Sequence, residues 1–288
     1  MPKLKFTRGV SMKWVAPHLT GGLGNRLFQF HATYGVSKKW NRDCVFFLPM
    51  CGKNDHGPFE TIFDLYPMIP IVETASEWNV IPEKSGQCFI FDEFGDNPEA
   101  ETLVIGGWRQ TPLYFKDSPP PLPNWSRFLS DAHMVELKAK YELGEKCWML
   151  HVRLGDYKQL PHHQIPVLNY YERCLNEVPK DSKILLFSDE PDLCKEWVYK
   201  IVRSRGLDFQ VCDEMDEVTP LWMMSECLGG GITANSTFSW WGAYFAKQKA
   251  KQKQKDGYRA YYPDVWGKGL PPARDVVPEW GIRMPIEH

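Results

Sequence analysis

The stretch Cys147–Tyr157 reads CWMLHVRLGDY. Its first seven residues form a short apolar run broken only by His151 and closed by Arg153, which predicts a buried β-strand. This strand would carry His151 and Arg153 to its carboxyl end, with Asp156 just beyond it. A cation, an imidazole and a carboxylate therefore lie within six residues, and the surrounding chain has to supply their context.

Strands and helices alternate on both sides of this stretch, between about residues 130 and 250. Further strands are predicted at 183–189 (KILLFSD), 209–214 (FQVCDE) and 229–234 (GGGITA). Helices are predicted at 130–143, 168–179, 190–206, 218–229 and 235–250, with Ser130 or Asp131 and Thr219 as candidate N-caps. This alternation predicts right-handed β-α-β units and a parallel sheet covered on both faces.

The first part of the chain has a weaker pattern. A glycine loop leads into an amphipathic helix within residues 18–40, and a short strand is predicted from Cys44. A helix is predicted at 59–69, and a strand from Thr102 turns at two glycines. The proline-rich stretch KDSPPPLPNW, residues 116–125, cannot be a helix interior or a central strand. We therefore predict two domains, residues 1–125 and 126–288.

Composition excludes several classes of protein. The 288 residues are 43% hydrophobic and 24% charged, with a formal net charge of −2, which argues against a nucleic-acid partner. The eight cysteines show no C-x-x-C pair, so a zinc site is not expected and the thiols should be reduced and mostly buried. The N-terminal residues do not form a signal peptide, and no run of about 20 apolar residues occurs. The chain is expected to be cytoplasmic, with no membrane span.

Three polar clusters follow predicted strands, at the ends where ligands of open α/β sheets bind. They are His151/Arg153/Asp156, Ser188/Asp189 and the turn Asn235–Ser239. Arg153 can hold a diphosphate through paired hydrogen bonds, and His151 can contact a nucleotide or transfer a proton. Asp156 could orient Arg153 or cap the following segment. The alternative for the whole cluster is a structural Arg–Asp pair beside a core histidine.

The turn Asn235–Ser239 brings three hydroxyls to the start of a helix, an arrangement typical of anion sites. Its alternative is an ordinary N-cap followed by two core tryptophans, Trp240 and Trp241. Asp189 could accept hydrogen bonds from a ligand or cap the next helix. Gly21–Asn25 (GGLGN) permits close approach of a ligand, yet it is neither G-x-G-x-x-G nor a P-loop, and a tight turn would explain it equally.

Paired carboxylates that would clamp a diphosphate through a metal are missing from the sequence. There is no Asp-x-Asp triplet, and Glu214-Met215-Asp216 is interpreted as a solvated loop. This favours an arginine and a helix N-terminus as the groups that offset leaving-group charge.

Six stretches occur together in order: GGLGNRLFQF, GGWRQTPLYF, HVRLGDY, PVLNYYERCL, FSDE and ANSTFSWWGAYF. Between residues 18 and 266 the chain thereby resembles the α-1,2-fucosyltransferases of glycosyltransferase family 11. NSTFSWWGA and GGLGN are specific in combination, whereas HVRxGDY is shared with α-1,6- and protein O-fucosyltransferases.

The resemblance implies a GT-B architecture, with two Rossmann-like domains facing across a donor/acceptor cleft. It implies transfer of L-fucose from GDP-β-L-fucose to a glycan, with inversion, no metal and no cofactor. Arg153 and Asp156 would be catalytic. The resemblance places the donor against His151, Arg153, Asp189, Asn235, Ser236, Thr237, Ser239, Gly22, Gly24 and Asn25.

The chain departs from the family pattern at three places. Leu154 stands where a second arginine is usual, Arg26 replaces a glutamine and adds a charge, and His31 replaces a small residue. We expect His31 to be structural or at the rim of the cleft. The general base is not identified, with Asp156, Glu93 and Asp92 as candidates.

Other functions stay open at this point. They are fucosyl transfer with α-1,6 or protein O-linkage, a non-catalytic sugar-nucleotide or glycan-binding module, and a Rossmann dehydrogenase, which the missing G-x-G-x-x-G disfavours. Four aromatic residues could stack on acceptor sugars, although most tryptophans should be core: Trp108, Tyr114, Trp125 and Trp266.

Overall fold

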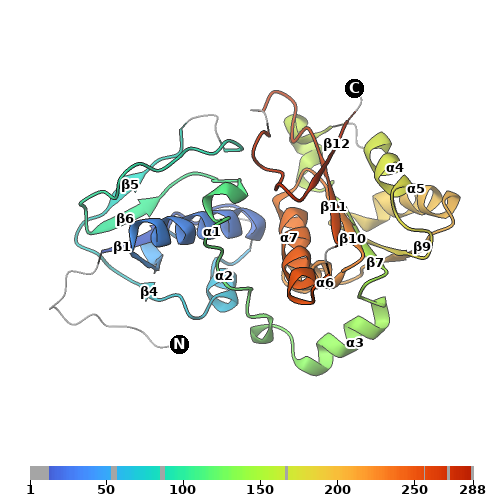
Figure 1. Ribbon diagram of the computed structural model, residues 1–288, viewed down its shortest axis with the longest axis horizontal. Coiled ribbons are helices and arrows are strands. Elements are labelled where there is room, and N and C mark those ends of the chain that lie inside the picture. The colour runs from blue at the N-terminus through green and yellow to red at the C-terminus, as the bar shows by residue number, and fades with distance from the viewer. Residues whose placement is uncertain are drawn as a thin grey trace. The chain divides into compact units, whose positions relative to one another are not determined.

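The computed structural model describes residues 13–52, 57–84, 88–165, 168–255, 257–270 and 273–286. The chain forms two compact units (Figure 1). The first takes in the chain up to Arg127 together with Ala273–Pro278, and the second takes in Phe128–Pro272 and Glu279–His288. The single boundary predicted near residue 125 did not include this return of Ala273–Pro278. Asp275 anchors it, since its carboxylate accepts the Phe91 N–H at 2.7 Å and its own N–H donates to the Phe89 carbonyl at 3.0 Å.

The first unit is built on a parallel four-stranded sheet in the order β2-β1-β6-β5. Its strands are β1 (Trp14–Pro17), β2 (Asp43–Cys44), β6 (Thr102–Ile105) and β5 (Asn79–Ile81), and β3 (Phe46–Phe47) pairs separately with β4 (Ile71–Val72). The helices are α1 (Leu23–Trp40), α2 (Glu60–Leu65) and the short 3₁₀ turns η1 (Leu48–Met50), η2 (Pro112–Tyr114) and η3 (Trp125–Arg127). The strand predicted from Cys44 is therefore split between two sheets.

The second unit is built on a parallel six-stranded sheet in the order β12-β11-β10-β7-β8-β9. Its strands are β7 (Cys147–Val152), β8 (Lys183–Ser188), β9 (Asp208–Val211), β10 (Gly230–Ile232), β11 (Arg259–Pro263) and β12 (Ile282–Met284). Its helices are α3 (Asp131–Tyr141), α4 (Leu168–Asn176), α5 (Pro191–Ser204), α6 (Thr219–Glu226) and α7 (Thr237–Gln252), with 3₁₀ turns η4 (Asp156–Gln159) and η5 (Pro161–His163).

Both faces of this sheet are covered, as Figure 1 shows, with α6 and α7 on one side and α4 and α5 on the other. Alternate residues of β7 point to opposite faces. Trp148, Leu150 and Val152 pack in one core with α4 and α5. His151 has the opposite orientation, and its ring lies beside Phe238 of α7, with 6.1 Å between centroids.

The predicted α/β class with parallel sheets is confirmed in both units. The interpretation of Trp240 and Trp241 as core residues is also confirmed, since both are fully buried. Ser130 is the N-cap of α3, where its hydroxyl accepts the His133 N–H at 3.2 Å. The predicted cap at Thr219 is wrong, because Asp216 supplies the carboxylate that accepts the N–H groups of Val218 and Thr219.

Candidate functional site

Three neighbouring strands of the second unit end at the same edge of its sheet. β7 lies between β10 and β8, and all three run in the same direction. Their carboxyl ends therefore bring together the segments after Val152, Ser188 and Ile232. These are the three polar clusters that the sequence places at strand ends.

Arg153 lies at the centre of this cluster. Its Nε and Nη2 donate to the same Asp156 oxygen at 3.0 and 2.8 Å, and its Nη1 lies 3.2 Å from Asp189 Oδ2. The guanidinium also lies 5.8 Å from the ring centroid of Tyr157. About a third of the arginine side chain is exposed, so the cation is oriented by two carboxylates and still faces solvent.

Asp189 joins the end of β8 to the loop after β7. Its Oδ1 accepts the Leu154 N–H at 2.9 Å, and the Leu154 side chain packs against the core. Capping of α5, one of the two roles considered for Asp189, is not what the structure shows, because Glu190 holds the N-cap position without a side-chain cap. A Cβ on Gly155 would overlap the Asp189 carboxylate, so the close approach of this loop depends on glycine.

The turn before α7 is tied to the loop after β7. The Tyr157 hydroxyl donates to the Asn235 carbonyl at 2.8 Å. The Asn235 amide in turn donates to the carbonyls of His163 and Trp266, both at 3.0 Å. The rings of Tyr157 and His163 stack, with 4.5 Å between centroids and 14° between planes. These contacts give Asn235 a structural role that fixes two loops beside Arg153.

The hydroxyls at the start of α7 differ in what they can reach. Ser236 is the N-cap, where its oxygen accepts the Phe238 N–H at 3.3 Å, and Thr237 is half-buried in the first turn. Ser239 is fully buried, accepts the Ala234 N–H at 3.2 Å and donates to the Ser236 carbonyl at 3.3 Å. Ser236, Thr237 and the N-terminal N–H groups of α7 are thus the anion-binding candidates, and Ser239 holds the turn together.

His151 lies under this turn and is 3% exposed. Burial lowers its pKa to about 3, and the charge of Arg153 acts in the same direction. The imidazole is therefore neutral at physiological pH and can both donate and accept a hydrogen bond. Within the described ranges, its Nδ1 has no hydrogen-bonding partner, so a buried polar atom at the strand end is unused.

The remaining predicted donor residues belong to the first unit, at the carboxyl end of β1. Gly22 is the N-cap of α1, Gly24 lies in its first turn, and the Asn25 side chain accepts a hydrogen bond from Gln110 Nε2 at 3.0 Å. Arg26 is fully buried and donates to the carbonyls of Gly21, Gly57 and Pro58 at 2.6–2.9 Å. Arg26 is therefore a structural tie, and the charge that it adds is buried within the first unit.

His31 is structural, as one of its two expected roles requires. It is 1% exposed, and its Nε2 lies 2.8 Å from the Tyr66 hydroxyl. Burial lowers its pKa well below the usual value, so the ring is neutral.

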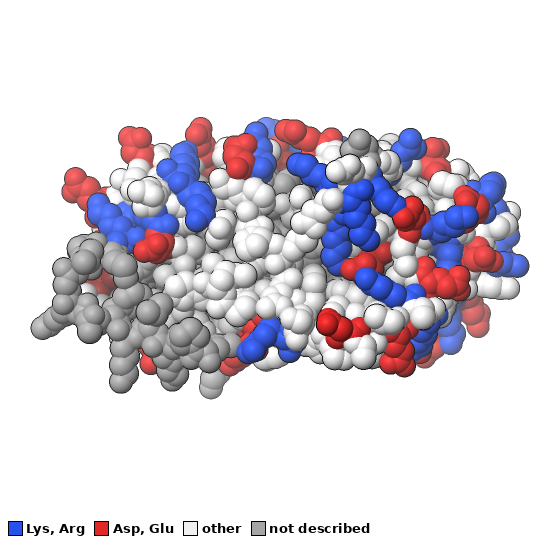
Figure 2. Space-filling view, turned by 60° about the horizontal axis from the view of Figure 1, so that its bottom comes forward, with Lys and Arg blue, Asp and Glu red and all other residues white. Residues whose placement is uncertain are grey.

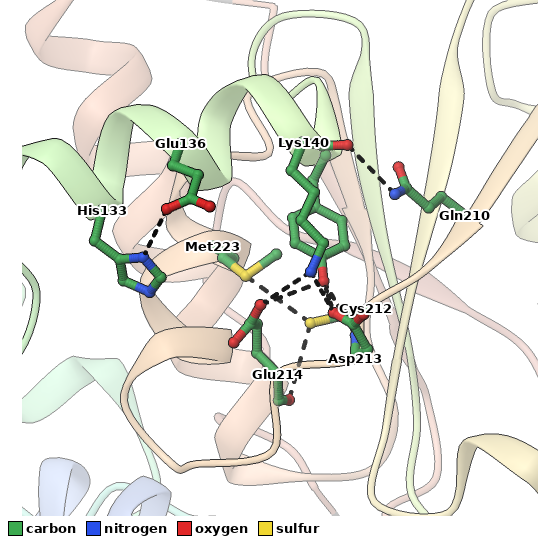
Figure 3. Close-up of polar contacts among 9 residues, drawn as sticks. His133, Glu136, Lys140, Gln210, Cys212, Asp213, Glu214 and Met223 are labelled. Carbon is green, nitrogen blue, oxygen red and sulfur yellow. Dashed lines mark hydrogen bonds and ion pairs between the residues drawn. The ribbon is translucent and has the colours of Figure 1, made fainter.

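Glu214 and Asp216 are held by separate structural contacts. Figure 3 shows Lys140 of α3 reaching Asp213 and Glu214, at 2.9 and 3.4 Å from the nearest oxygens. The Tyr141 hydroxyl also contacts Asp213. Asp216 caps α6, as described above. The interpretation of this triplet as a strand-to-helix loop is confirmed.

Sequence reasoning did not assign roles to Tyr157 and His163. Tyr157 closes the quoted HVRLGDY stretch, so its position in the motif was a usable signal. His163 has no such signal, because it reaches the site only through the turns η4 and η5. There, Gln164 donates to the carbonyls of Tyr157 and Lys158, both at 2.8 Å, and closes the loop.

The surface charges, the helices, the N-terminal stretch and the cysteines also bear on predictions made from the sequence. Figure 2 shows Lys and Arg interspersed with Asp and Glu on the face that it presents. Among the described helices, none combines the length and the apolar composition needed to cross a bilayer. The N-terminal stretch, for which a signal peptide was not expected, lies mostly outside the described residues.

The eight cysteines are free thiols and six of them are buried, as expected.

Comparison with known proteins gives consistent matches. Residues 136–253 match the model of glycosyl transferase family 11. The chain is 33% identical to the O-antigen biosynthesis glycosyltransferase WbnK of Escherichia coli, covering 78% of this chain and 88% of that protein. It is 28% identical to an Escherichia coli α-1,2-colitosyltransferase, covering 81% of this chain and 88% of that protein.

Among solved structures, the fucosyltransferase NodZ from Bradyrhizobium matches with a TM-score of 0.48 and 15% identity, covering 80% of this chain and 92% of NodZ. The extent of the match to WbnK establishes the relationship without the structural comparison. The chain belongs to glycosyl transferase family 11, and it is a fucosyltransferase-like glycosyltransferase.

Proposed function

We propose that the protein transfers L-fucose from GDP-β-L-fucose to O2 of a β-galactoside, with inversion and without a metal. The observation that carries this proposal is the position of Arg153. It is held by Asp156 and Asp189 at the carboxyl edge of a parallel sheet, where the neighbouring strand β10 leads into α7. A cation beside a helix N-terminus suits a departing diphosphate.

The proposed reaction develops charge at two places. As the bond from fucose C1 to GDP breaks, negative charge grows on the diphosphate, and Arg153, Ser236, Thr237 and the α7 N-terminus stabilise it. Positive charge grows at C1 and the ring oxygen, and the acceptor hydroxyl attacks C1 from the opposite face. The acceptor hydroxyl releases its proton to solvent water in this step.

Asp156 acts in this proposal as a positioning residue. Both of its hydrogen bonds to Arg153 use one oxygen, and they fix the plane of the guanidinium. His151 supplies a neutral imidazole for the GDP moiety, because its low pKa prevents it from adding charge. Asp189 keeps the Arg153 loop in place, and Asn235 fixes the α7 turn. Gly22, Gly24 and Asn25 are also proposed to bind the donor.

The linkage is supported by the relative named as an α-1,2-colitosyltransferase. Colitose is L-fucose without the 3-hydroxyl group, so the same relative favours GDP-colitose as a second candidate donor. The two donors differ by one hydroxyl, and direct competition between them decides the sugar. α-1,6 and protein O-linked transfer are the remaining alternatives.

The test is transfer from GDP-fucose or GDP-colitose to a panel of β-galactosides in EDTA, with wild type, Arg153→Ala and Arg203→Ala. Arg203 is a matched control, since it lies near the end of α5 and pairs with Asp208 at 3.5 Å, at the opposite edge of the sheet. Loss of Arg153 should lower kcat on the order of a hundredfold. Arg203→Ala should leave kcat within twofold.

The product linkage, determined by NMR, then separates the alternatives. An α-1,2 product formed in EDTA supports the proposal, and a different linkage redirects it to another acceptor position. Activity that EDTA abolishes and Mg²⁺ restores contradicts the metal-free mechanism. A full rate in Arg153→Ala contradicts the assignment of Arg153.

A further inference from the structure

The structure separates the four aromatic residues that were candidates for sugar stacking. Tyr114, Trp125 and Trp266 are 4–8% exposed and belong to the core. Trp108 is 40% exposed. It lies three residues after the end of β6, at the carboxyl edge of the first unit's sheet, where ligands of parallel sheets bind.

The backbone on either side of Trp108 is in an uncommon conformation. Gly107 has φ +97°, and a Cβ there would overlap the Glu83 side chain. Arg109 has φ +50°, which is unfavourable for an arginine. A residue other than glycine persists in this conformation only where the surroundings enforce it. An exposed tryptophan held between two left-handed residues is therefore an outlier that needs an explanation.

The surroundings that enforce this conformation are extensive. Glu83, after β5, accepts the N–H groups of Trp108 and Arg109 at 3.1 and 2.7 Å. The Arg109 side chain is 1% exposed and donates to the carbonyls of Gly106 and Pro82, each at 2.9 Å. Its guanidinium also lies 4.7 Å from the ring centroid of Phe94. The backbone is thus held at Trp108, whose side chain stays exposed.

One edge of the indole packs on the glycine loop that precedes α1. A Cβ on Gly21 would come within 3.0 Å of Trp108 Cζ3 and within 2.8 Å of Asn25 Nδ2. Gln110, two residues after Trp108, donates to Asn25. An exposed aromatic ring therefore lies close to the Asn25 amide, a combination that suits a ligand ring with one apolar face and polar edges.

A β-galactopyranoside has this form. Its axial O4 leaves the hydrogens of C3, C4 and C5 on one face, and its hydroxyl groups lie around the rim. We propose that Trp108 is the acceptor platform, on which a galactose ring of the acceptor stacks by its C–H face. This inference rests on the proposed function, and it identifies the residue that selects the acceptor.

The experiment measures KM and kcat for lactose at saturating GDP-fucose, and KM for GDP-fucose at fixed lactose, in wild type, Trp108→Ala and Trp108→Phe. Trp78→Ala is the matched control, since Trp78 is also an exposed tryptophan of the first unit, at 39% exposure. Trp108→Ala should raise the KM for lactose at least tenfold, about 1.4 kcal/mol. The KM for GDP-fucose and the rate of GDP-fucose hydrolysis should stay within twofold, and Trp108→Phe should recover part of the affinity.

Each other outcome decides a separate question. An unchanged KM for lactose in Trp108→Ala overturns the platform and leaves the proposed function standing. A similar rise in Trp78→Ala, or a fall in kcat for hydrolysis, shows a structural effect and also overturns it. If the wild type transfers no sugar, the proposed function fails, and saturation-transfer NMR with lactose still tests Trp108. A wild-type signal that is lost in Trp108→Ala supports the platform, and no wild-type signal overturns it.

Discussion

Arg153 Nη1 lies 3.2 Å from Asp189 Oδ2, and the Asp189 Oδ1 accepts the Leu154 N–H at 2.9 Å. One carboxylate thus holds both the side chain of the central arginine and the backbone directly after it. Asp189 comes from the end of β8, and Arg153 from the end of β7. The arginine is positioned by the sheet itself as well as by its own loop.

Replacing Asp189 should therefore affect donor binding through Arg153. Asp189→Asn keeps an oxygen for the Leu154 N–H and removes the charge that faces the guanidinium. We expect a several-fold rise in the KM for GDP-fucose with little change in melting temperature, because the pair is partly exposed and contributes little to stability. Asp189→Ala should lower both affinity and melting temperature. Equal donor affinity in all three proteins would show that Asp189 does not position Arg153.

Gly155 makes this contact sterically possible. In Gly155→Ala, the new Cβ would overlap the Asp189 carboxylate and displace either the loop or the aspartate. Because misplacement by about 1 Å can cost on the order of a hundredfold in rate, we expect kcat/KM for GDP-fucose to fall at least tenfold. Gly257→Ala is the control, since a Cβ there meets nothing within 4 Å. Steady-state kinetics of both variants give the comparison, and equal values would rule out this steric role.

The sheet of the second unit could be predicted in part because β7 and β8 are apolar runs that end in polar residues. β11 and β12 could not be predicted in this way. Arg259–Pro263 follows a lysine-rich helix end and contains a proline, and Ile282–Met284 is only three residues long. Both strands are stabilised by pairing with strands distant in sequence, which local pattern does not report.

The site shows the same limit. Adjacent parallel strands end together, so the meeting of the Arg153, Asp189 and Asn235 segments followed from the alternation of strands and helices. The role of each polar group did not follow. Asp189 could have capped α5, and the buried Ser239 has the same composition signal as the accessible Thr237. Which role each residue takes depends on the direction of the backbone over one or two residues. The periodic pattern of apolar residues in the sequence does not specify this direction.

Acid sensitivity should come in part from His151. Its pKa falls from 6.5 in the unfolded chain to about 3 in the fold, chiefly through burial. Between these pKa values the unfolded state binds more protons than the folded state. The free energy of unfolding is therefore unaffected by His151 above pH 6.5 and falls as the pH drops from 6.5 toward 3. At pH 5 the free energy of unfolding is lower by about 2 kcal/mol, because each pH unit below 6.5 contributes about 1.4 kcal/mol. Urea unfolding at pH 7.5 and 5 should show a smaller difference for His151→Asn, and His31 and His163, whose pKa values burial also lowers, contribute to the remainder. An identical difference in wild type and variant would contradict this assignment.

Arg26 should stabilise the first unit strongly. Its guanidinium donates to the Gly21, Gly57 and Pro58 carbonyls, which tie the start of α1 to the chain before α2. Arg26→Gln has too few donors for all three carbonyls, and each hydrogen bond to a charged group that is lost contributes about 1.5–3 kcal/mol. We therefore expect a lower urea midpoint in Arg26→Gln. Arg127→Gln, which removes an exposed ion pair with Asp64 at 3.1 Å, serves as the control and should change the midpoint little. Equal midpoints for the two variants would mean that water replaces the arginine at these carbonyls, and that α1 does not depend on it.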